Sequence, residues 1–508
     1  MKFLVRMSAL VLLATALISC SGGGSSSTTE PVLTPSVTVG TITGFGSVIV
    51  NGIRFDDSAA VITINDQSGT RAQLKVGMVV AVEGSVAACP NPEIALCEGV
   101  AAQIRFRNNL EGPITLLNRL TNTIQVMGRE VQFDADTLVE GGSSPDINGL
   151  ALGDIVAISG LEEQLRIRAR LVQRLGQFVA GTTPMQALGT VANLNLADGS
   201  CTVDGVPVSF LGLAAESLPQ GGLAQGQYVQ VSGTGSGTGL ITADRIQLRD
   251  RISYPDAALV QLEGFVSDYV SVADFVVADQ RVDARDAIFR NGSAADLGNG
   301  AKVLIEGLMQ DGVLIASKVV FRLEANAQTV NVQIGAPIQS KMTSTASLVV
   351  LGQSIQTTTL TQFIDRTSTA GASGAGSGGS PEALSYADLQ VGDRVDVMAY
   401  RDAEGKFIAT RVERTVADEL LVAKGPVDSA MAPTQMNLFG IPVLTGTNTR
   451  YRDIDGNLIS DQAFYTFLSV PPDVASIVRA QGVASMTING AIDATRSTAT
   501  RGEVEIAQ

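Results

Sequence analysis

The side chains that could carry out chemistry in this chain are carboxylates, hydroxyls and thiols, because none of its 508 residues is a histidine. Without an imidazole, neither a Ser-His-Asp triad nor a Cys-His pair can form. Paired carboxylates could act as the acid and base of a glycosidase, but such sites usually also need aromatic platforms for the sugar, and the sequence has no Trp and only 7 Tyr. Phosphate-binding loops of the Walker or dinucleotide type are absent from the sequence. We therefore predict no enzyme, no catalytic residue and no cofactor.

One acidic segment has the oxygen spacing of a calcium loop. Asp453, Asp455 and Asn457 alternate along the chain, and Asp461 follows them. Carboxylate and amide oxygens are the ligands that Ca²⁺ takes in proteins. However, the glycine of this segment falls two positions too early for an EF-hand, and Asp-Gly-Asn is a common hairpin turn. A weak calcium site and a plain turn therefore both remain open, and no other metal site is predicted.

Basic side chains recur in five short segments, mainly at two-residue or four-residue spacing, which in a β-strand places them on one side. These candidate anion-binding residues are Arg105, Arg107, Arg166, Arg168, Arg170, Arg245, Arg249, Arg251, Lys318, Arg322 and Arg411. One hypothesis is a stripe that binds an anionic polymer such as lipopolysaccharide, acidic exopolysaccharide or extracellular DNA. The alternative, which we favour, is that these charges keep edge strands from pairing and form salt bridges to nearby acidic residues.

The first nineteen residues have the three parts of a signal peptide: a basic start, an apolar run over residues 7–18, and a small residue directly before Cys20. The run is shorter than the roughly 20 residues of a membrane-spanning helix. The sequence Leu17-Ile-Ser-Cys20 resembles the bacterial lipobox, and this resemblance implies that Cys20 receives a diacylglycerol, which is a durable anchor. By resemblance to sorted lipoproteins, Ser21 lacks the Asp that retains them in the inner membrane. We therefore predict an outer-membrane address, with the face left open.

The mature chain is strongly acidic. Removing the signal peptide removes Lys2 and Arg6, which changes the formal charge from -15 to -17. Binding to nucleic acid needs a basic surface that releases counterions from phosphates. Nucleic acid is therefore not an expected partner.

The cysteines beyond the anchor are Cys89, Cys97 and Cys201. Cys89 and Cys97 flank a short segment in a chain predicted to reach a compartment that permits disulfides, so we predict that they pair. Cys201 is then left over, and we expect a buried, inert thiol.

The elements that position these residues repeat along the chain, with a period of about 75 residues. The pattern apolar-x-Gly-x-x-apolar places glycines at 52, 128, 205, 352 and 440, with Asp279 at the equivalent position of another copy. Such residues between β-branched runs predict tight hairpin turns. A second pattern, Gly-x-x-Val-x-Val-x-Gly, has the two-residue period of a half-buried strand. It begins at Gly77, Gly153, Gly226 and Gly300, with a looser copy from Gly392.

Each copy opens with a glycine and a short β run, at Gly40, Gly112, Gly189, Gly264, Gly335 and Gly425. Five or so short strands per copy favour a small closed barrel, which leaves no exposed edge. The predicted fold class is therefore all-β, a tandem array of about six small OB-like β-barrel domains, with a two-layer sandwich as the alternative for each copy.

The predicted boundaries are a signal peptide over 1–19, a lipidated and flexible tether over 20–38, and β-repeats over 39–109, 110–180, 187–252, 260–325, 330–418 and 420–508. A Gly/Ser-rich run over 370–380 is predicted to be a flexible loop inside repeat five. Repeat six is the most divergent copy, and we expect a helical turn within residues 470–481.

One segment resembles a known family. Thr43-Gly-Phe-Gly-Ser-Val-Ile-Val-Asn-Gly-Ile-Arg-Phe55 is similar to the opening motif of domain of unknown function 5666, which bacterial lipoproteins carry in tandem. Weaker motifs extend the resemblance over nearly the whole mature chain. It implies an OB-like fold and an envelope location, and it transfers no catalytic or binding residue.

These features predict a non-enzymatic cell-envelope lipoprotein, with six barrels in a row on a tether, acting as an extended spacer, scaffold or adhesion and binding array. One alternative is a module that binds oligosaccharide or anionic polymer, against which the 5% aromatic content counts. Another is an accessory subunit of an envelope assembly. The expected partners are the membrane, through the lipid anchor, and envelope polysaccharide or envelope proteins.

Overall fold

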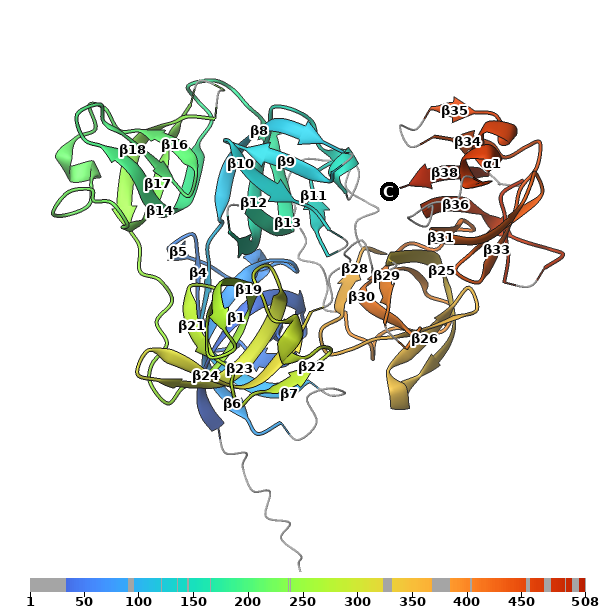
Figure 1. The fold of residues 1–508 in the computed structure, drawn as a ribbon, viewed down its shortest axis with the longest axis horizontal. Coiled ribbons are helices and arrows are strands. Elements are labelled where there is room, and N and C mark those ends of the chain that lie inside the picture. The colour runs from blue at the N-terminus through green and yellow to red at the C-terminus, as the bar shows by residue number, and fades with distance from the viewer. Residues whose placement is uncertain are drawn as a thin grey trace, which may run out of the picture. The chain divides into compact units, whose positions relative to one another are not determined.

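The computed structural model describes residues 33–89, 96–119, 121–134, 136–143, 146–164, 166–235, 237, 239–322, 331–367, 384–402, 404–453, 457–469, 477–488, 490–495 and 502–507. In these residues the regular elements are β-strands, five 3₁₀ turns and a single α-helix, α1 (Asp461–Ser469). The strands form successive groups along the chain (Figure 1). Residues 1–32, which hold the predicted signal peptide and Cys20, lie outside the described residues, as does the predicted Gly/Ser loop over 370–380. No helix in the described part is both long and apolar enough to cross a membrane.

Repeat one shows how each barrel closes. Its strands are β1 (Leu33–Gly44), β2 (Val48–Val50), β3 (Ile53–Asp56), β4 (Val61–Ile64), β5 (Gln67–Ser68), β6 (Val79–Ala87) and β7 (Cys97–Phe106). Strand β1 pairs antiparallel with β2 and β6, β2 pairs with β3, β3 runs parallel to β7, and β7 pairs antiparallel with β6. The order β1-β2-β3-β7-β6 thus returns to β1, which is a closed OB-like barrel. Strand β4 adds to β7 in parallel.

The same order recurs in the next four repeats. Repeat two contains β8 (Leu110–Asn118), β9 (Thr123–Val126), β10 (Arg129–Gln132), β11 (Leu138–Glu140), β12 (Asp154–Glu163) and β13 (Arg166–Gln177). Repeat three contains β14 (Met185–Asn195), β15 (Ser200–Val203), β16 (Val206–Ser209), β17 (Tyr228–Thr234) and β18 (Ile241–Leu248). Repeat four contains β19 (Leu259–Ser271), β20 (Asp274–Val277), β21 (Gln280–Asp283), β22 (Ile288–Arg290), β23 (Lys302–Gln310) and β24 (Val313–Phe321). Repeat five contains β25 (Asn331–Met342), β26 (Ser347–Val350), β27 (Gln353–Gln356), β28 (Gln362–Asp365), β29 (Arg394–Arg401) and β30 (Phe407–Arg414).

In each of these repeats the third strand runs parallel to the last one, as the OB-like order requires. The predicted fold class is therefore confirmed, and the sandwich alternative is not the observed one. The 3₁₀ turns are η1 (Arg71–Gln73), η2 (Ile147–Gly149), η3 (Ala215–Ser217), η4 (Ala294–Asp296) and η5 (Thr343–Thr345).

Repeat six keeps this order with its last strand divided in two. It contains β31 (Leu421–Met431), β32 (Gln435–Leu438), β33 (Ile441–Leu444), β34 (Arg450–Arg452), β35 (Leu458–Ile459), β36 (Ile477–Ala484), β37 (Ile492–Asp493) and β38 (Glu503–Ala507). Of the stretch predicted to include a helical turn, residues 477–481 belong to β36, while 470–476 lie outside the described residues, so the turn stays a prediction. The helix lies earlier, at α1, where Phe464 and Tyr465 pack against Tyr451.

The hairpin turns follow the predicted chemistry. Asn51 and Gly52 between β2 and β3 have φ of 52° and 81°, and Ala278 and Asp279 between β20 and β21 have φ of 48° and 64°. Positive φ at both central residues is the geometry that matches the twist of paired strands, and it favours Gly, Asn and Asp. The second glycine of the Val-rich pattern has another role. A side chain at Gly84 would collide with the carbonyl group of Val100, at a β-bulge in the β6–β7 pair.

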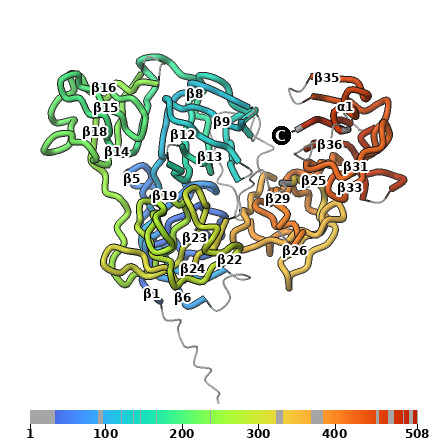
Figure 2. The backbone as a smooth tube through the Cα atoms, in the orientation of Figure 1, coloured from blue at the N-terminus to red at the C-terminus, as the bar shows by residue number. Residues whose placement is uncertain are grey.

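Two predictions about the layout are wrong. Strand β1 begins at Leu33, not at residue 39, because residues 33–38 pair with the end of β6. The barrels also do not follow one another in a simple row. Strand β1 of repeat one pairs in parallel with β19 of repeat four, from Ser36 opposite Leu259 to Val39 opposite Leu262, so that these segments lie together in Figures 1 and 2.

Further contacts join other repeats. Strand β8 pairs with β14, which links repeats two and three, and β25 pairs with β31, which links repeats five and six. The apolar core of repeat one also includes Leu138 and Leu171 of repeat two and Ile364 of repeat five. Repeats one, two, four and five therefore meet within the described part of the chain.

Candidate functional site

The basic residues that the sequence singles out are almost all in ion pairs. Each of them except the exposed Arg245 lies within ion-pair distance of an Asp or Glu side chain. The structure therefore supports the salt-bridge interpretation of this pattern over a stripe of cations that face solvent. It gathers six of these residues into two clusters, neither of which follows a single strand.

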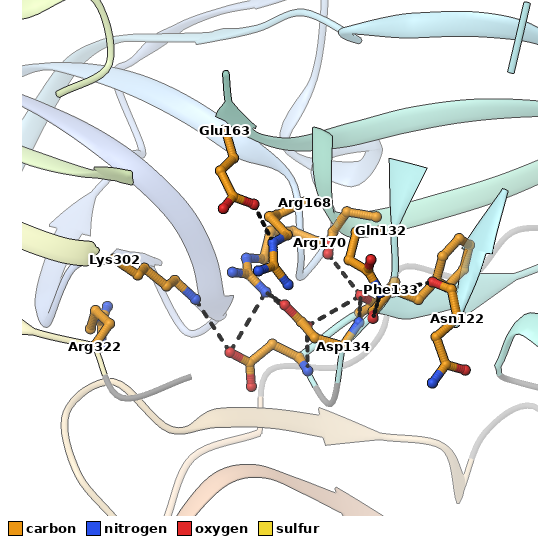
Figure 3. A network of polar contacts seen from close by, with 12 residues as sticks. Asn122, Gln132, Phe133, Asp134, Glu163, Arg168, Arg170, Lys302 and Arg322 are labelled. Carbon is orange, nitrogen blue, oxygen red and sulfur yellow. Dashed lines mark hydrogen bonds and ion pairs between the residues drawn. The ribbon is translucent and has the colours of Figure 1, made fainter. Parts of the chain in front are cut away.

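The first cluster joins repeats two and four. Arg170 of β13 is 1% exposed and lies 2.9 Å from Asp134 and 3.7 Å from Asp136, both in the loop after β10. Lys302, at the start of β23, lies 3.5 Å from the same Asp136 carboxylate. Figure 3 shows Lys302 and Arg170 approaching this loop from different repeats. Buried charges are costly unless they are paired, so these contacts hold the two repeats in one arrangement.

Glu263 of β19 extends the cluster to repeat one. Its carboxylate lies 3.7 Å from Arg322 and 4.0 Å from Lys302, and it accepts a hydrogen bond of 2.9 Å from the backbone N–H of Thr41. Burial alone would raise the pKa of this carboxyl group, but Arg322, Lys302, Arg170 and the Thr41 N–H together outweigh burial and lower the pKa to about 2. Glu263 therefore stays ionised at neutral pH.

Arg411 of β30 brings repeat five into the same cluster. It is 6% exposed, lies 3.0 Å from Glu413, and donates a hydrogen bond of 3.1 Å to the carbonyl oxygen of Thr137 in repeat two. Burial opposes ionisation of Asp136, yet Lys302, Arg170 and Arg411 lower its pKa to about 2. We call Arg170, Lys302, Arg322 and Arg411, with their carboxylate partners Asp134, Asp136, Glu263 and Glu413, the charged junction.

The second cluster surrounds Asp66. Arg107 of repeat one and Arg249, directly after the last strand of repeat three, both lie 2.7 Å from its carboxylate. Nearby, Arg251 pairs with Asp279 and stacks over the ring of Tyr228 at 4.6 Å from its centroid. These arginines also connect different repeats, and each of them is paired with a carboxylate of the protein itself.

A cavity of about 550 Å³ adjoins the charged junction. Residues of repeats one, two, four and five line it, among them Asp136, Arg170, Glu263, Lys302 and Arg322. The rest of its lining mixes polar and apolar side chains, and the polar ones include Thr41 of β1, Gln261 of β19, Gln362 of β28 and Tyr400 of β29. The cavity thus combines buried charges, amides and hydroxyls from four barrels.

A family model described as Domain of unknown function (DUF5666) matches residues 111–173, 189–247, 263–320 and 336–413, about half of the chain. The chain belongs to the DUF5666 family. The matched segments are repeats two to five, and the predicted resemblance is confirmed for them. The segment Thr43–Phe55 and repeat six lie outside the matched ranges, although repeats one and six have the same strand order as the DUF5666 repeats. No curated protein matches the chain.

The structure describes the three cysteines of this DUF5666 protein that follow the predicted anchor. Cys89 and Cys97 form a disulfide, as predicted. Cys201 is free and buried, and burial raises the pKa of its thiol to about 11, which agrees with an inert cysteine.

The calcium hypothesis gains no support from the described residues. Both carboxylate oxygens of Asp453, directly after β34, accept hydrogen bonds from Asn457, directly before β35. Asp461 is the first residue of α1, and Asp455 lies outside the described residues. Among the residues that are described, no group of three acidic or thiol side chains is arranged to hold a metal ion.

Sequence reasoning missed the acidic half of the charged junction and Lys302. One local signal was available, because Glu263 directly precedes the opening Gly264 of its DUF5666 repeat, as Glu111 precedes Gly112. Nothing local marks Asp136 or Lys302, since they pair with each other across two repeats and their partners within a repeat, Arg170 and Glu263, are more than 30 residues away along the chain.

Proposed function

We propose that this DUF5666 protein is a non-enzymatic lipoprotein of the outer membrane, anchored through Cys20, whose barrels act as an interlocked scaffold. The observation that carries the scaffold role is the charged junction. Repeats two, four and five contribute its side chains, a backbone N–H of repeat one donates to Glu263, and its members Arg170, Lys302, Glu263 and Arg411 are all less than a tenth exposed. Removing one member would leave a buried charge without its partner, which is strongly destabilising.

An interlocked scaffold holds the surfaces of its barrels in fixed relative positions, whereas barrels joined only by flexible linkers do not. Strand pairing between β1 and β19 and the hydrogen bond from Thr41 to Glu263 join repeats one and four, and the ion pair between Lys302 and Asp136 joins repeats two and four. Surfaces from different barrels are then held at constant spacing. Such spacing suits a protein that organises neighbours or ligands at the envelope.

The export and anchoring part of the proposal rests on the N-terminal sequence. A basic start, an apolar run and a small residue precede Cys20, in the pattern of a lipobox. The absence of histidine from the whole chain supports a non-enzymatic role.

The other candidate functions are less well supported. A surface stripe for anionic polymers would need cations that are not already paired, and the ion pairs described above leave only Arg245 of the proposed set without one among the described residues. An accessory subunit of an envelope assembly is compatible with a scaffold, and partners that co-purify with the intact protein would favour it.

The anchoring is tested on intact cells that express the natural chain, Cys20→Ala, or the control Cys201→Ala. The control removes a buried thiol and leaves the lipobox intact. We expect the natural chain and Cys201→Ala to stay in the membrane fraction and Cys20→Ala to become soluble. Protease and antibody access on intact cells then distinguishes the two faces of the outer membrane. A natural chain that is soluble, or one that is retained in the membrane without Cys20, would overturn the anchoring proposal.

A further inference from the structure

The cavity beside the charged junction contains polar atoms that lack partners. The side-chain oxygens Thr41 Oγ1, Gln261 Oε1 and Gln362 Oε1 have no hydrogen-bond partner among the described residues, although the three side chains line the cavity and are only 3%, 7% and 4% exposed. Buried polar groups in proteins are nearly always hydrogen-bonded. Three such groups, from repeats one, four and five, line the same cavity. Their presence indicates that a bound molecule forms hydrogen bonds with them.

Most of the charged groups around the cavity are paired with one another. Lys302 and Arg322 pair with Glu263, and Lys318 lies 3.4 Å from Glu306, which also accepts a hydrogen bond from Gln261. Farther out, Lys406 lies 2.8 Å from Glu404. An anion that enters would therefore meet carboxylates as well as cations. The lining favours an uncharged occupant.

The unpaired groups also specify the chemistry of that occupant. Gln261 Oε1 and Gln362 Oε1 can only accept hydrogen bonds, Thr41 Oγ1 can accept or donate, and Arg322 Nε, which is buried and also without a partner, can only donate. A hydroxyl group can do both. Several hydroxyls on one molecule would therefore pair with the acceptors and the donor together, and Tyr400 adds an aromatic side chain to the lining.

We propose that this cavity binds a short, uncharged oligosaccharide. Its volume of about 550 Å³ lies within the range of roughly 300–1,000 Å³ typical of ligand sites. The site draws its groups from four barrels, so the interlocked arrangement of the repeats is what creates it. The proposal goes beyond the scaffold role and does not depend on the lipid anchor.

The test uses the purified full chain carrying Cys20→Ala, with cellotriose, maltotriose and N,N′,N″-triacetylchitotriose as neutral probes and trigalacturonate as the acidic comparison. Saturation-transfer NMR detects weak binding, and titration calorimetry measures the affinity. We expect at least one neutral probe to bind and trigalacturonate to bind more weakly or not at all.

Two variants locate the binding in this cavity. Thr41→Val and Gln362→Leu each remove a hydrogen-bonding group, and the loss of one hydrogen bond should weaken binding about threefold to tenfold. Thr38→Val is the matched control, because Thr38 lies on the same strand β1, is fully buried and also has an unpaired Oγ1, but does not line the cavity. The affinity of Thr38→Val for the neutral probe should equal that of the starting chain. The thermal midpoint of unfolding of each variant shows whether that variant is folded.

Three results would overturn the proposal. One is that no neutral probe binds at millimolar concentration. Another is that trigalacturonate binds more tightly than every neutral probe. The last is that Thr41→Val, with a thermal midpoint like that of Thr38→Val, binds the neutral probe as well as the control does.

Discussion

Glu263→Gln should remove a pH-dependent part of the protein's stability. Glu263 is buried between repeats one and four, and Arg322 and Lys302 lower its pKa, against the effect of burial, from 4.5 to about 2. A shift of one pKa unit corresponds to about 1.4 kcal/mol, so ionised Glu263 stabilises the folded chain by about 3 kcal/mol relative to its protonated form. Glutamine has nearly the shape of the protonated side chain but cannot ionise.

The direction of this pH dependence follows from the lowered pKa of Glu263 in the folded chain. The stabilisation is fully present above pH 4.5, where Glu263 is ionised in both the folded and the unfolded chain, and it disappears as pH falls from 4.5 to about 2. At pH 7 the Glu263→Gln variant should therefore unfold with a free energy about 3 kcal/mol below that of the natural chain. The difference should become progressively smaller below pH 4.5.

The assay is urea unfolding followed by circular dichroism, at pH values from 7 down to 3. Glu404→Gln is the control, because Glu404 also pairs with a lysine, Lys406 at 2.8 Å, but its side chain is 73% exposed. Exposed pairs contribute little, so this variant should match the natural chain at every pH. Equal stability of Glu263→Gln and the natural chain at pH 7 would refute the reasoning, and so would a difference that is the same at pH 7 and pH 3.

Three further predictions concern local features. Reduction of the Cys89–Cys97 disulfide, whose cysteines are 8 residues apart, should lower the free energy of unfolding by about 2.5 kcal/mol, measured by urea unfolding with and without dithiothreitol. Cys201, with a pKa raised to about 11, should resist alkylation by iodoacetamide at pH 8 until the chain is unfolded, and mass spectrometry would show any early labelling that contradicts this. Gly160→Ala should lower the thermal midpoint more than Gly128→Ala, because a Cβ at Gly160 would collide with the backbone of Arg168, whereas the turn glycine Gly128 has open space and only a positive φ of 86° to strain.

Short-range sequence patterns were sufficient to predict the fold of the individual barrels. The hairpin at Asn51 and Gly52, the Val-rich strand that ends at Gly84, and the Cys89–Cys97 disulfide all depend on residues within about ten positions of one another, so local propensity and spacing specify them. The six-fold recurrence of these patterns then predicted the OB-like array and the DUF5666 resemblance, both of which are confirmed.

The candidate site was only partly predictable. Arg170, Arg322 and Arg411 stood out by their spacing, and the sequence could favour salt bridges over a polymer-binding stripe, but it could not name the partners. The start of β1 at Leu33 was missed for a related reason. Its first residues are strand because β6 and, from Ser36, β19 pair with them.

By itself, the sequence of this protein determined its all-β class, its repeats, its turns and its disulfide, because each of these arises from interactions between near neighbours in the chain. Only the tertiary structure decided which barrels touch, which carboxylate each buried arginine meets, and where the polar cavity forms. The contact of Thr41 with Glu263 spans 222 residues, and that of Arg411 with Thr137 spans 274. Such pairs depend on how whole barrels pack, because a buried charge is stable only where packing brings its partner.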